Sequence, residues 1–551
     1  MDADAAGASP GGSRGRVARR RAPNEAPRSE LPIGVFLCPN DELESIGPAR
    51  QRRPRLGNAN DPIILTTPIY YVNGPPHLGH AACTLAADTV ARLHRARGRE
   101  VFFQTGTDEH GISVERAAAA EGLAPQGLAD RNAATFQKAW QALDIDPDRF
   151  LRTTEPAHHR AALELWRRLA EAGELRRGVY EGFYCAPCEA FLSAEELDPG
   201  ETCPVHHRVC EWQREENTFF RLSRHAAALR RLVAETGFVQ PASRRAEVLT
   251  WIGRGLPDLS LTRSSVRWGI PAPGLPGEVL YVFGVDALAN YLTGLGFPDP
   301  ALESAWRGRF PHTVHVIGKE ILRFHALYWP AFLRAAGLPL PKQLRVHGHF
   351  TVEGQKLSKT AGNGIDPVAL AEEVGSDALR FFALRSKPFD RDGDFSRARA
   401  RELWNAELAG GLGNWAQRVT RLVSKHRAGR SPVPPPLPRA EEAALLEAAT
   451  ALCREADERT TSFAFDRALQ SVARLVQEAS RHLERTKPWA LAGARDPHSV
   501  RRFDEIAAAH LTALRSATRS IAPYTPRAAA ALGERLGAVV REGPAPYPRL
   551  P

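Results

Sequence analysis

The segment Pro68–His80 constrains the fold of this chain more than any other part of the sequence. A strand-like run (62–67) enters a turn rich in glycine and proline, and an amphipathic helical run follows to residue 97. The free N–H groups and positive dipole end of a helix start suit an anion, and His77 and His80 share one helix face there. The alternative is a pair of surface histidines. We expect a phosphate site at the carboxyl end of a strand, where open α/β sheets bind nucleotides.

Strand and helix patterns alternate along much of the chain. The segment 61–176 opens with a strand pattern at 63–67 and a second strand at 100–104, and helical patterns follow at 111–121, 126–143 and 156–173. The alternation resumes after a segment rich in Cys, His, Pro and Gly, with strands at 279–283, 314–317 and 343–350 and helices at 286–293 and 319–336. From about residue 398 only helical patterns remain. The predicted fold class is therefore α/β with a parallel sheet, followed by an all-α region.

Composition places the chain among soluble multi-domain proteins. It has 551 residues, of which 43% are hydrophobic and 25% charged, and its apolar runs are too short for a membrane span or a signal peptide. The net charge of +10 suits a polyanionic partner. The alternative is a GC-rich coding sequence, which by itself makes arginine abundant. The seven cysteines are odd in number, and four lie within 185–210, which favours a metal site in a reducing compartment over disulfides.

A second motif lies about 270 residues after the histidines. Lys356-Leu-Ser-Lys-Thr360 lies between glycines, and two lysines on a flexible loop can clamp a triphosphate as mobile point charges. Alone, such a loop is more often simply solvated. Together with His77-Leu-Gly-His80 it is a specific signal.

These two motifs resemble the signatures of the class I aminoacyl-tRNA synthetases, and within them the chain is similar to the methionyl-tRNA synthetases. The resemblance covers about 61–535, and its other motifs include Gly106–Gly111, Arg152–Thr154, Trp268–Pro271, His315–Lys319, Tyr328–Pro330 and Asp392–Ser396. It implies ATP-dependent ligation of L-methionine to tRNA(Met) through a methionyl-adenylate. It also implies a Rossmann-type catalytic domain with an inserted zinc knuckle, an all-α anticodon-binding bundle, and a need for ATP, Mg²⁺ and one structural Zn²⁺.

Composition and the strand and helix patterns, together with the resemblance, divide the chain into segments. We expect a disordered extension at 1–60, the two halves of the catalytic domain at 61–176 and 236–350, a connective insertion with the zinc knuckle at 177–235, the lysine loop and its connecting segment at 351–397, and the anticodon-binding bundle at 398–551.

The same resemblance assigns the catalytic and ATP-binding residues. The methionine carboxylate attacks the α-phosphate of ATP, so His77 and His80 are expected to bond the phosphates while Lys356 and Lys359 hold the departing pyrophosphate. Positioning and charge neutralisation can carry such a step. The expected ATP-binding set is His77, Gly79, His80, Gly318, Lys319, Lys356 and Lys359.

The amino-acid site is implied by the resemblance alone. Asp108 matches the carboxylate that binds the substrate ammonium, and Arg263 matches a nearby arginine that is as easily an ordinary surface pair. The expected side-chain pocket comprises Ile69, Tyr71, Phe283, Gly284, Tyr291, Ile321, His325 and Trp329. An apolar, aromatic pocket suits a thioether, although core packing explains the same residues.

One departure from the family falls in this pocket. The family reads Tyr-Val-Trp-x-Asp-Ala, whereas this chain reads Tyr281-Val-Phe-Gly-Val-Asp286-Ala287. The tryptophan position therefore holds Phe283 or Gly284, depending on where the extra residue is placed. We hypothesise an altered amino-acid selectivity or inhibitor response.

Two paired motifs predict a zinc site. Cys185-x2-Cys188 and Cys203-x2-His206 are separated by 14 residues, and each pair can chelate through a tight knuckle, completing a tetrahedral Cys3His site with no open position. His207 and Cys210 are alternatives for the fourth ligand.

In the helical region, Asn414 and Arg418 are four residues apart on one face, and Trp489 follows on a later helix. They match the residues that read the anticodon in the family, where a splayed base can stack on an indole and bond an amide and a guanidinium. A capping asparagine and a core tryptophan are the alternative interpretation.

We expect a cytoplasmic monomer. The competing functions are a specialised paralogue with altered selectivity and a non-catalytic RNA-binding homologue. Intact His77, His80, Asp108 and Lys359 argue against the second.

Overall fold

The computed structural model of the chain describes residues 62–185, 190–192, 197–204, 208–352, 355–356 and 364–551. The predicted extension at 1–60 lies outside these residues. The chain separates into two compact units, Met1–Ala49 and Arg50–Pro551, and the second contains every described residue.

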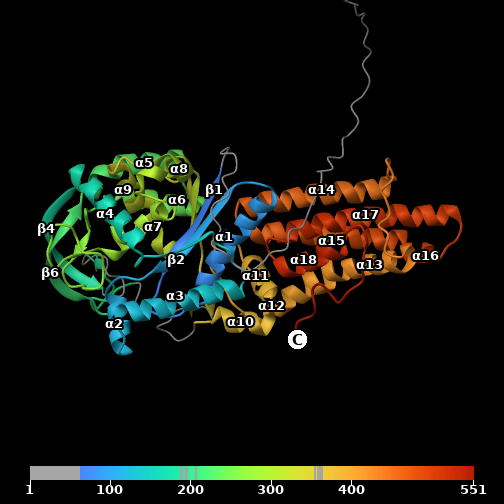
Figure 1. Cartoon of the computed structure of the whole chain (residues 1–551), viewed down its shortest axis with the longest axis horizontal. Helices are drawn as coiled ribbons and strands as arrows, with labels where there is room; N and C mark the ends of the chain where they lie inside the picture. Colours follow the sequence, from blue (N-terminus) through green and yellow to red (C-terminus); the bar gives the residue numbers. More distant parts are fainter. Residues whose placement is uncertain (1–61, 186–189, 193–196, 205–207, 353–354, 357–363) are drawn as a thin grey trace, which may run out of the picture. The chain divides into compact units, whose positions relative to one another are not determined.

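A six-stranded parallel sheet lies at the centre of the N-terminal half, in the order β3-β2-β1-β11-β12-β7 (Figure 1). Its strands are β1 (Ile63–Tyr71), β2 (Val101–Asp108), β3 (Arg149–Arg152), β7 (Val239–Gln240), β11 (Thr313–Gly318) and β12 (Gln343–His347). The strand order reverses between β1 and β11, so a crevice is expected outside their carboxyl ends. The predicted α/β class is confirmed.

Helices cover both faces of this sheet. One face packs on α1 (Leu78–Ala96), whose apolar side is continuous with Leu65, Phe103 and Val316 of the strands. The other face packs with Ile317, Leu344 and Val346 against a second core. The helices of this half are α2 (Ile112–Ala120), α3 (Pro125–Ala142), α4 (Pro156–Glu171), α5 (Ala226–Glu235), α6 (Ala242–Gly253), α7 (Ala287–Thr293), α8 (Glu303–Arg309) and α9 (Trp329–Ala335).

The expected strand at 279–283 is wrong beyond its second residue. β10 covers only Val279–Leu280, and Val282–Asp286 form a π-helical turn (η3) with a kink at Gly284. The expected helix at 319–336 contains a π-helical segment at Phe324–Tyr328 (η7) before α9. π turns insert a residue into a helix and occur often at functional sites, which a 3.6-residue pattern does not reveal.

An antiparallel sheet forms the insertion between the two halves. Its order is β5-β4-β6-β8, and its long hairpin pairs Leu175 with Phe220 and continues to Tyr184 with Glu211. The strands are β4 (Leu175–Cys185), β5 (Ala190–Leu192), β6 (Glu211–Phe220) and β8 (Leu259–Ser260), and β9 (Thr262–Arg263) pairs separately with β10.

A small three-stranded sheet follows β12. It contains β13 (Phe350–Val352), β14 (Gln355–Lys356) and β15 (Gly393–Asp394) in the order β14-β13-β15. The expected strand at 343–350 is therefore two strands, because β12 ends at His347. The helices α10 (Pro367–Val374) and α11 (Ser376–Arg385) lie between β14 and β15.

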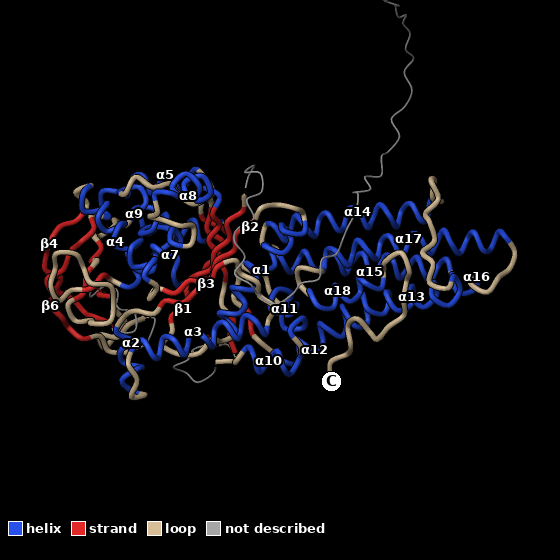
Figure 2. Tube along the Cα trace, viewed as in Figure 1, coloured by secondary structure: helices blue, strands red, loops and turns tan. Residues whose placement is uncertain are grey.

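Beyond β15, the regular secondary structure of the described residues is helical (Figure 2). It comprises α12 (Arg397–Leu403), the π-helical η8 (Trp404–Gly413), α13 (Asn414–Arg427), α14 (Ala440–Thr461), α15 (Phe465–Thr486), α16 (Pro488–Leu491), α17 (Pro497–Ile521) and α18 (Pro526–Arg535). Side chains of α13, α14, α15 and α17 join the same buried core as α1. The expected all-α region is confirmed.

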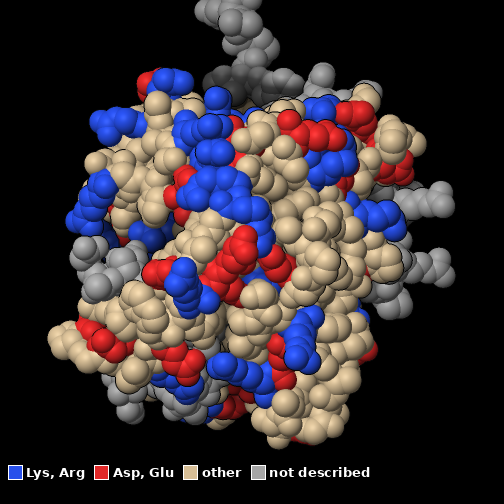
Figure 3. All heavy atoms as spheres, turned by 90° about the vertical axis from the view of Figure 1, so that its left-hand side faces the viewer, with Lys and Arg blue, Asp and Glu red and all other residues tan. Residues whose placement is uncertain are grey.

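No helix among the described residues is both long and apolar enough to cross a membrane. The end of the molecule that carries β4 and β6 shows basic and acidic side chains interspersed (Figure 3). The net positive charge is therefore not collected into a single basic patch on this face.

Candidate functional site

His77 and His80 hold each other in place at the start of α1. His77 is the N-cap residue, and its Nδ1 accepts from the Gly79 N–H at 3.1 Å, while Nδ1 of His80 accepts from the His77 N–H at 3.2 Å. The two rings stack with centroids 3.7 Å apart. Because both Nδ1 atoms accept, each neutral ring carries its hydrogen on Nε2.

The expected free N–H groups at this helix start are not available. Gly79 donates to the His77 ring, Leu78 donates to the Ile365 carbonyl at 2.9 Å, and His80 donates to the His77 carbonyl at 2.9 Å. The histidine pair itself satisfies the helix end, as a capping box does. An anion at this point would meet imidazole N–H groups and the helix dipole instead of free backbone donors.

The lysine motif is anchored beside these histidines. Lys356 lies in β14, opposite Thr351 of β13, and the chain resumes at Gly364, where an added Cβ would lie 3.9 Å from the His77 Cβ. The bond from Leu78 to Ile365 fixes this return point. Lys359 lies outside the described residues, and the side chain of Lys356 is not described.

Gly318 and Lys319 lie where β11 ends, next to β1. A Cβ at Gly318 would fall 2.4 Å from the Glu320 carboxylate, so a larger residue there would require this side chain to move. The Lys319 ammonium pairs with Asp392 at 2.6 Å, and Asp392 also accepts from the His349 N–H at 2.8 Å. Lys319 is therefore tied to the segment that carries β15.

Asp108 ends β2 directly opposite Tyr71, the last residue of β1. Its side chain is 3% exposed. Ile69 lies two residues earlier on β1, opposite Gly106. The carboxylate therefore lies at the same edge of the sheet as the histidine turn, because the carboxyl ends of parallel strands share an edge.

Four aromatic side chains form a buried cluster behind this edge. The Tyr291 ring lies 5.5 Å from that of His325 and 5.9 Å from that of Trp329, and Ile321 is half-buried beside them. His315 was not assigned a role from the sequence, although it lies in a recognised motif; its ring is 4.2 Å from Tyr291.

The hydrogen bonds of this cluster fix its protonation. The Ile321 carbonyl accepts from Nδ1 of His325 at 3.0 Å, so Nε2 accepts from the Tyr291 hydroxyl at 2.6 Å. Burial lowers the pKa of His325 to about 4. Nε2 of His315 accepts from Trp329 at 3.3 Å. Both imidazoles are neutral at pH 7, because burial lowers their pKa values, so this cluster carries no charge.

Phe283 and Gly284 have different neighbours. The Phe283 ring contacts Tyr71 at 5.5 Å and Phe324 at 5.9 Å. A Cβ at Gly284 would instead meet Tyr281 at 3.1 Å and Leu261 at 3.2 Å. Phe283 therefore packs in the aromatic group with Tyr71 and Phe324, whereas Gly284 lies at the kink of the π turn, against Tyr281 and Leu261.

Arg263 is buried, which excludes the ordinary surface pair that was its alternative. Its guanidinium lies 4.2 Å from the centre of the Tyr281 ring and donates to the Ser260 hydroxyl at 2.9 Å and the Thr262 carbonyl at 2.8 Å. Arg263 is 3% exposed.

Sequence reasoning missed a buried carboxylate that connects segments from the two halves of the α/β region. Asp286 accepts from His110 at 2.8 Å and from His158 at 3.0 Å. Burial would raise the pKa of Asp286, but these imidazoles outweigh it and hold the pKa below its usual range. The available sequence signal was their position: Asp286 lies two residues after Gly284 of the unusual Phe283-Gly284 pair, and His110 lies two residues after Asp108. Only the fold shows that they meet.

Three cysteines of the insertion are buried together: Cys185 at the end of β4, Cys203 and Cys210. Burial, together with like-charge repulsion from Cys185 and Cys203, raises the pKa of the Cys210 thiol to about 11. Cys188, His206 and His207 lie outside the described residues.

Arg418 and Trp489 meet at the surface of the helical region. The guanidinium lies 5.2 Å from the centre of the indole ring and donates to Glu484 at 2.8 Å. Trp489 is 42% exposed, so it is not a core residue. Asn414 is exposed one turn earlier on α13.

Known proteins match nearly all of this architecture. The family model "tRNA synthetases class I (M)" matches residues 63–209 and 197–420. The methionine–tRNA ligase of Thermosynechococcus vestitus is 42% identical over 481 residues, which are 87% of this chain and 90% of that protein. That of Mycobacterium bovis is 41% identical over 480 residues, which are 86% of this chain and 92% of that protein. The structure of Mycobacterium tuberculosis methionyl-tRNA synthetase in complex with methionyl-adenylate superposes with a TM-score of 0.85 at 37% identity and covers 89% of this chain and all of that one.

Proposed function

This chain belongs to the methionine–tRNA ligases, the methionyl-tRNA synthetases of class I, and from that membership we propose which residues carry its reaction. The observation that carries the proposal is the stacked His77–His80 pair, anchored beside the return point of the lysine loop at Ile365.

The histidines act on the phosphates of Mg²⁺-bound ATP. Each Nε2–H donates to a phosphate oxygen as the methionine carboxylate attacks the α-phosphate, and pyrophosphate leaves. Because the rings cap each other, their donors are oriented before ATP arrives, and no reorganisation is needed during the reaction. Lys356 and Lys359 hold the departing pyrophosphate, and Gly318 and Lys319 complete the ATP site.

Methionine binds between the sheet edge and the aromatic cluster. Asp108 accepts from its ammonium group, with Arg263 nearby, and the thioether lies against Ile69, Tyr71, Phe283, Gly284, Tyr291, Ile321, His325 and Trp329. The neutral imidazole of His325 suits a thioether because a charged ring would favour a polar substrate. Because Phe283 keeps the wall aromatic, we propose that methionine selectivity is retained and that only inhibitors shaped for the larger indole bind differently.

We propose that the insertion binds one structural zinc through Cys185, Cys188, Cys203 and Cys210. Buried neighbouring thiolates repel one another, and the raised pKa of Cys210 reflects this electrostatic cost of ionisation. A bound cation would remove that cost. Zinc would supply a tetrahedral cross-link and no open coordination position. The burial of Cys210 with Cys185 and Cys203 favours it over the fourth ligand inferred from spacing, His206.

The tRNA anticodon binds at Asn414, Arg418 and Trp489. Trp489 offers an indole face already opposed by a guanidinium, and a base can stack there while Asn414 bonds its edge. We also propose that the protein works in the cytoplasm as a monomer.

Methionine-dependent ATP–pyrophosphate exchange tests the assignment. The wild-type chain is expected to catalyse exchange with methionine, and His80→Asn to lower kcat by about a hundredfold, the typical loss of a transition-state donor. His498→Asn, an exposed histidine on α17, is the matched control and should leave the rate unchanged. Unchanged exchange in His80→Asn would contradict the role of the pair.

A further inference from the structure

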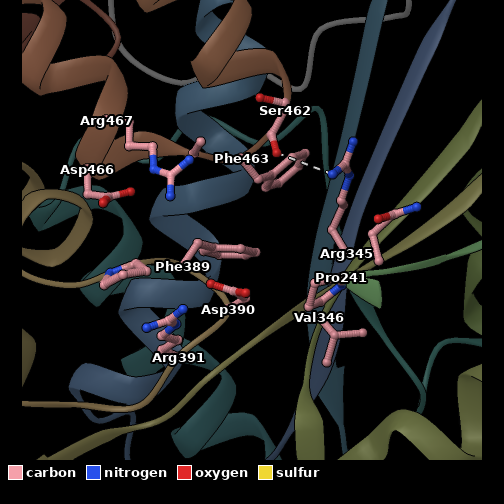
Figure 4. A pocket seen from close by; sticks show the side chains of 13 residues that line it. Pro241, Arg345, Val346, Phe389, Asp390, Arg391, Ser462, Phe463, Asp466 and Arg467 are labelled. Atoms are coloured by element: carbon pink, nitrogen blue, oxygen red, sulfur yellow. Dashed lines mark hydrogen bonds between the residues drawn. The ribbon is translucent and has the colours of Figure 1, made fainter. Parts of the chain in front are cut away.

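A pocket of about 330 Å³ lies where the catalytic sheet meets the helical bundle. Its walls come from β7 and β12, from the 388–391 loop after α11, and from the turn between α14 and α15 (Figure 4). The pocket shares no residue with the ATP, methionine, zinc or anticodon sites assigned above. Its volume is in the range of small-molecule sites.

Charged side chains line this pocket without neutralising one another. Three guanidiniums (Arg345, Arg391, Arg467) face two carboxylates (Asp390, Asp466), and no ion pair joins any of the five to another described residue. Arg345 lies across the pocket from Arg391 and Arg467 (Figure 4). The lining therefore has an excess of positive charge that suits an anion.

Arg345 is the most constrained of these groups. Its Nη1 donates to the Ser462 carbonyl at 3.2 Å, and its guanidinium lies 5.2 Å from the centre of the Phe463 ring. Its Nε is buried and has no hydrogen-bond partner among the residues that the structure describes. An unsatisfied buried donor is costly, and an acceptor placed in the pocket would remove that cost.

The pocket also presents an aromatic surface. Phe389 packs against Phe463 and Phe465, each with ring centroids at 5.4 Å, and it is itself only half-buried. Its ring lines the pocket between the charged groups (Figure 4). Planar bases stack on such rings and on guanidiniums.

We propose that this pocket binds one nucleotide, with its phosphate among the three arginines and its base against Phe389. Amino groups on the base edge would donate to Asp390 or Asp466. The same chemistry is found in a free nucleotide, such as the AMP that the reaction releases, and in a nucleotide of the bound tRNA. The tRNA source rests on the proposed function, and the free-nucleotide source does not.

Two measurements on the full chain separate these sources. The first is equilibrium dialysis of labelled AMP while a non-hydrolysable methionyl-adenylate analogue blocks the active site. The second is the KM for a tRNA(Met) transcript in aminoacylation. Both are made on wild type, on Arg391→Ala/Arg467→Ala, which alters two exposed side chains, and on Phe389→Leu. Arg474→Ala, another exposed arginine of α15, is the control.

A free-nucleotide site predicts one equivalent of AMP bound to blocked wild-type protein, with affinity lowered at least about tenfold in both pocket variants. A tRNA site predicts no AMP binding under that block and a KM for tRNA(Met) raised about tenfold, with pyrophosphate exchange unchanged. Wild-type behaviour of both pocket variants in both assays would overturn the proposal. Absence of methionine-dependent exchange in wild type would instead reject the proposed function and leave the AMP result to stand alone.

Discussion

The buried imidazoles of His325 and His510 are held neutral by their surroundings. His325 is 4% exposed and His510 is 1% exposed, and burial lowers their pKa values to about 4 and about 3. His510 accepts from the Trp415 indole at 3.1 Å and contacts His482 at 2.9 Å. Each of these two imidazoles is packed in the interior and is hydrogen-bonded to neighbouring side chains or backbone.

These shifts make the folded state sensitive to acid. The pKa of His325 in the folded state lies below the ordinary value of 6.5, so the unfolded chain binds a proton first as the pH falls. The contribution of His325 to the free energy of unfolding is therefore complete above pH 6.5 and is lost as pH falls toward 4. The shift corresponds to roughly 3 kcal/mol, of which about 2 kcal/mol is lost by pH 5. Urea unfolding from pH 7 to pH 4 checks this.

His325→Gln is expected to lower the number of protons taken up on unfolding by about one between these pH values. His498→Asn, at an exposed position, should keep the wild-type slope. An unchanged slope in His325→Gln would show that this ring is not held neutral.

At the scale of elements, α1 is joined to α11 through a buried ion pair, and the same arginine also reaches the C-terminal region. Arg380 of α11 donates to Asp88 of α1 at 2.6 Å, to the Pro523 carbonyl at 2.9 Å and to the Leu143 carbonyl at 2.9 Å. Both charged side chains are fully buried. Burial would raise the pKa of Asp88, but Arg92 and Arg380 together lower it. Arg380 thus links α1, the helix that begins at the His77–His80 pair, to the segment that follows α17.

Arg380→Met should destabilise the protein by about 3–5 kcal/mol, because it leaves the Asp88 carboxylate buried with only Arg92 as a partner. Urea unfolding measures the loss. The double variant Asp88→Asn/Arg380→Met should recover part of it, since neither charge is then left alone. Arg399→Ala, in an exposed pair with Glu402, should cost less than about 1 kcal/mol. Equal losses at both sites would contradict this account.

The choice of the proposed zinc ligands follows from how the hairpin folds. Cys210 immediately precedes β6 and is buried with Cys185, the last residue of β4, so the two chain ends of the hairpin bring these sulfurs together. Cys210→Ser is expected to reduce bound zinc from about one equivalent to well below half, measured by elemental analysis of purified protein. His206→Asn should keep it. The opposite pattern would restore the ligand set that motif spacing favours.

At the scale of the whole folded region, one buried core runs from the sheet face through α1 into the helical bundle. α16, with Trp489, lies at the end of the bundle away from the sheet (Figure 1). The proposed anticodon site and the proposed ATP site therefore lie at separate places on one packed scaffold.

Trp489→Ala separates these two activities. Loss of a stacked base costs about 1–3 kcal/mol, so kcat/KM for aminoacylation of tRNA(Met) should fall by about 5- to 150-fold, while exchange measured without tRNA stays within about twofold. Leu437→Ala, an exposed apolar residue of the same region, serves as the control. A parallel fall in exchange would indicate a folding defect and not a lost base contact.

The sequence by itself determined the α/β class, the family and the residue types at the site, because strand and helix periods and the two motifs are local properties. The sequence did not predict that His77 and His80 cap each other, that Phe283 packs against Tyr71 and Phe324 while Gly284 kinks a π turn, or that Asp286 meets His110. Those facts depend on close packing between segments that are distant in sequence, and on π turns that no simple period encodes. The tertiary structure decided them because burial, not composition, sets which hydrogen bonds each side chain must make.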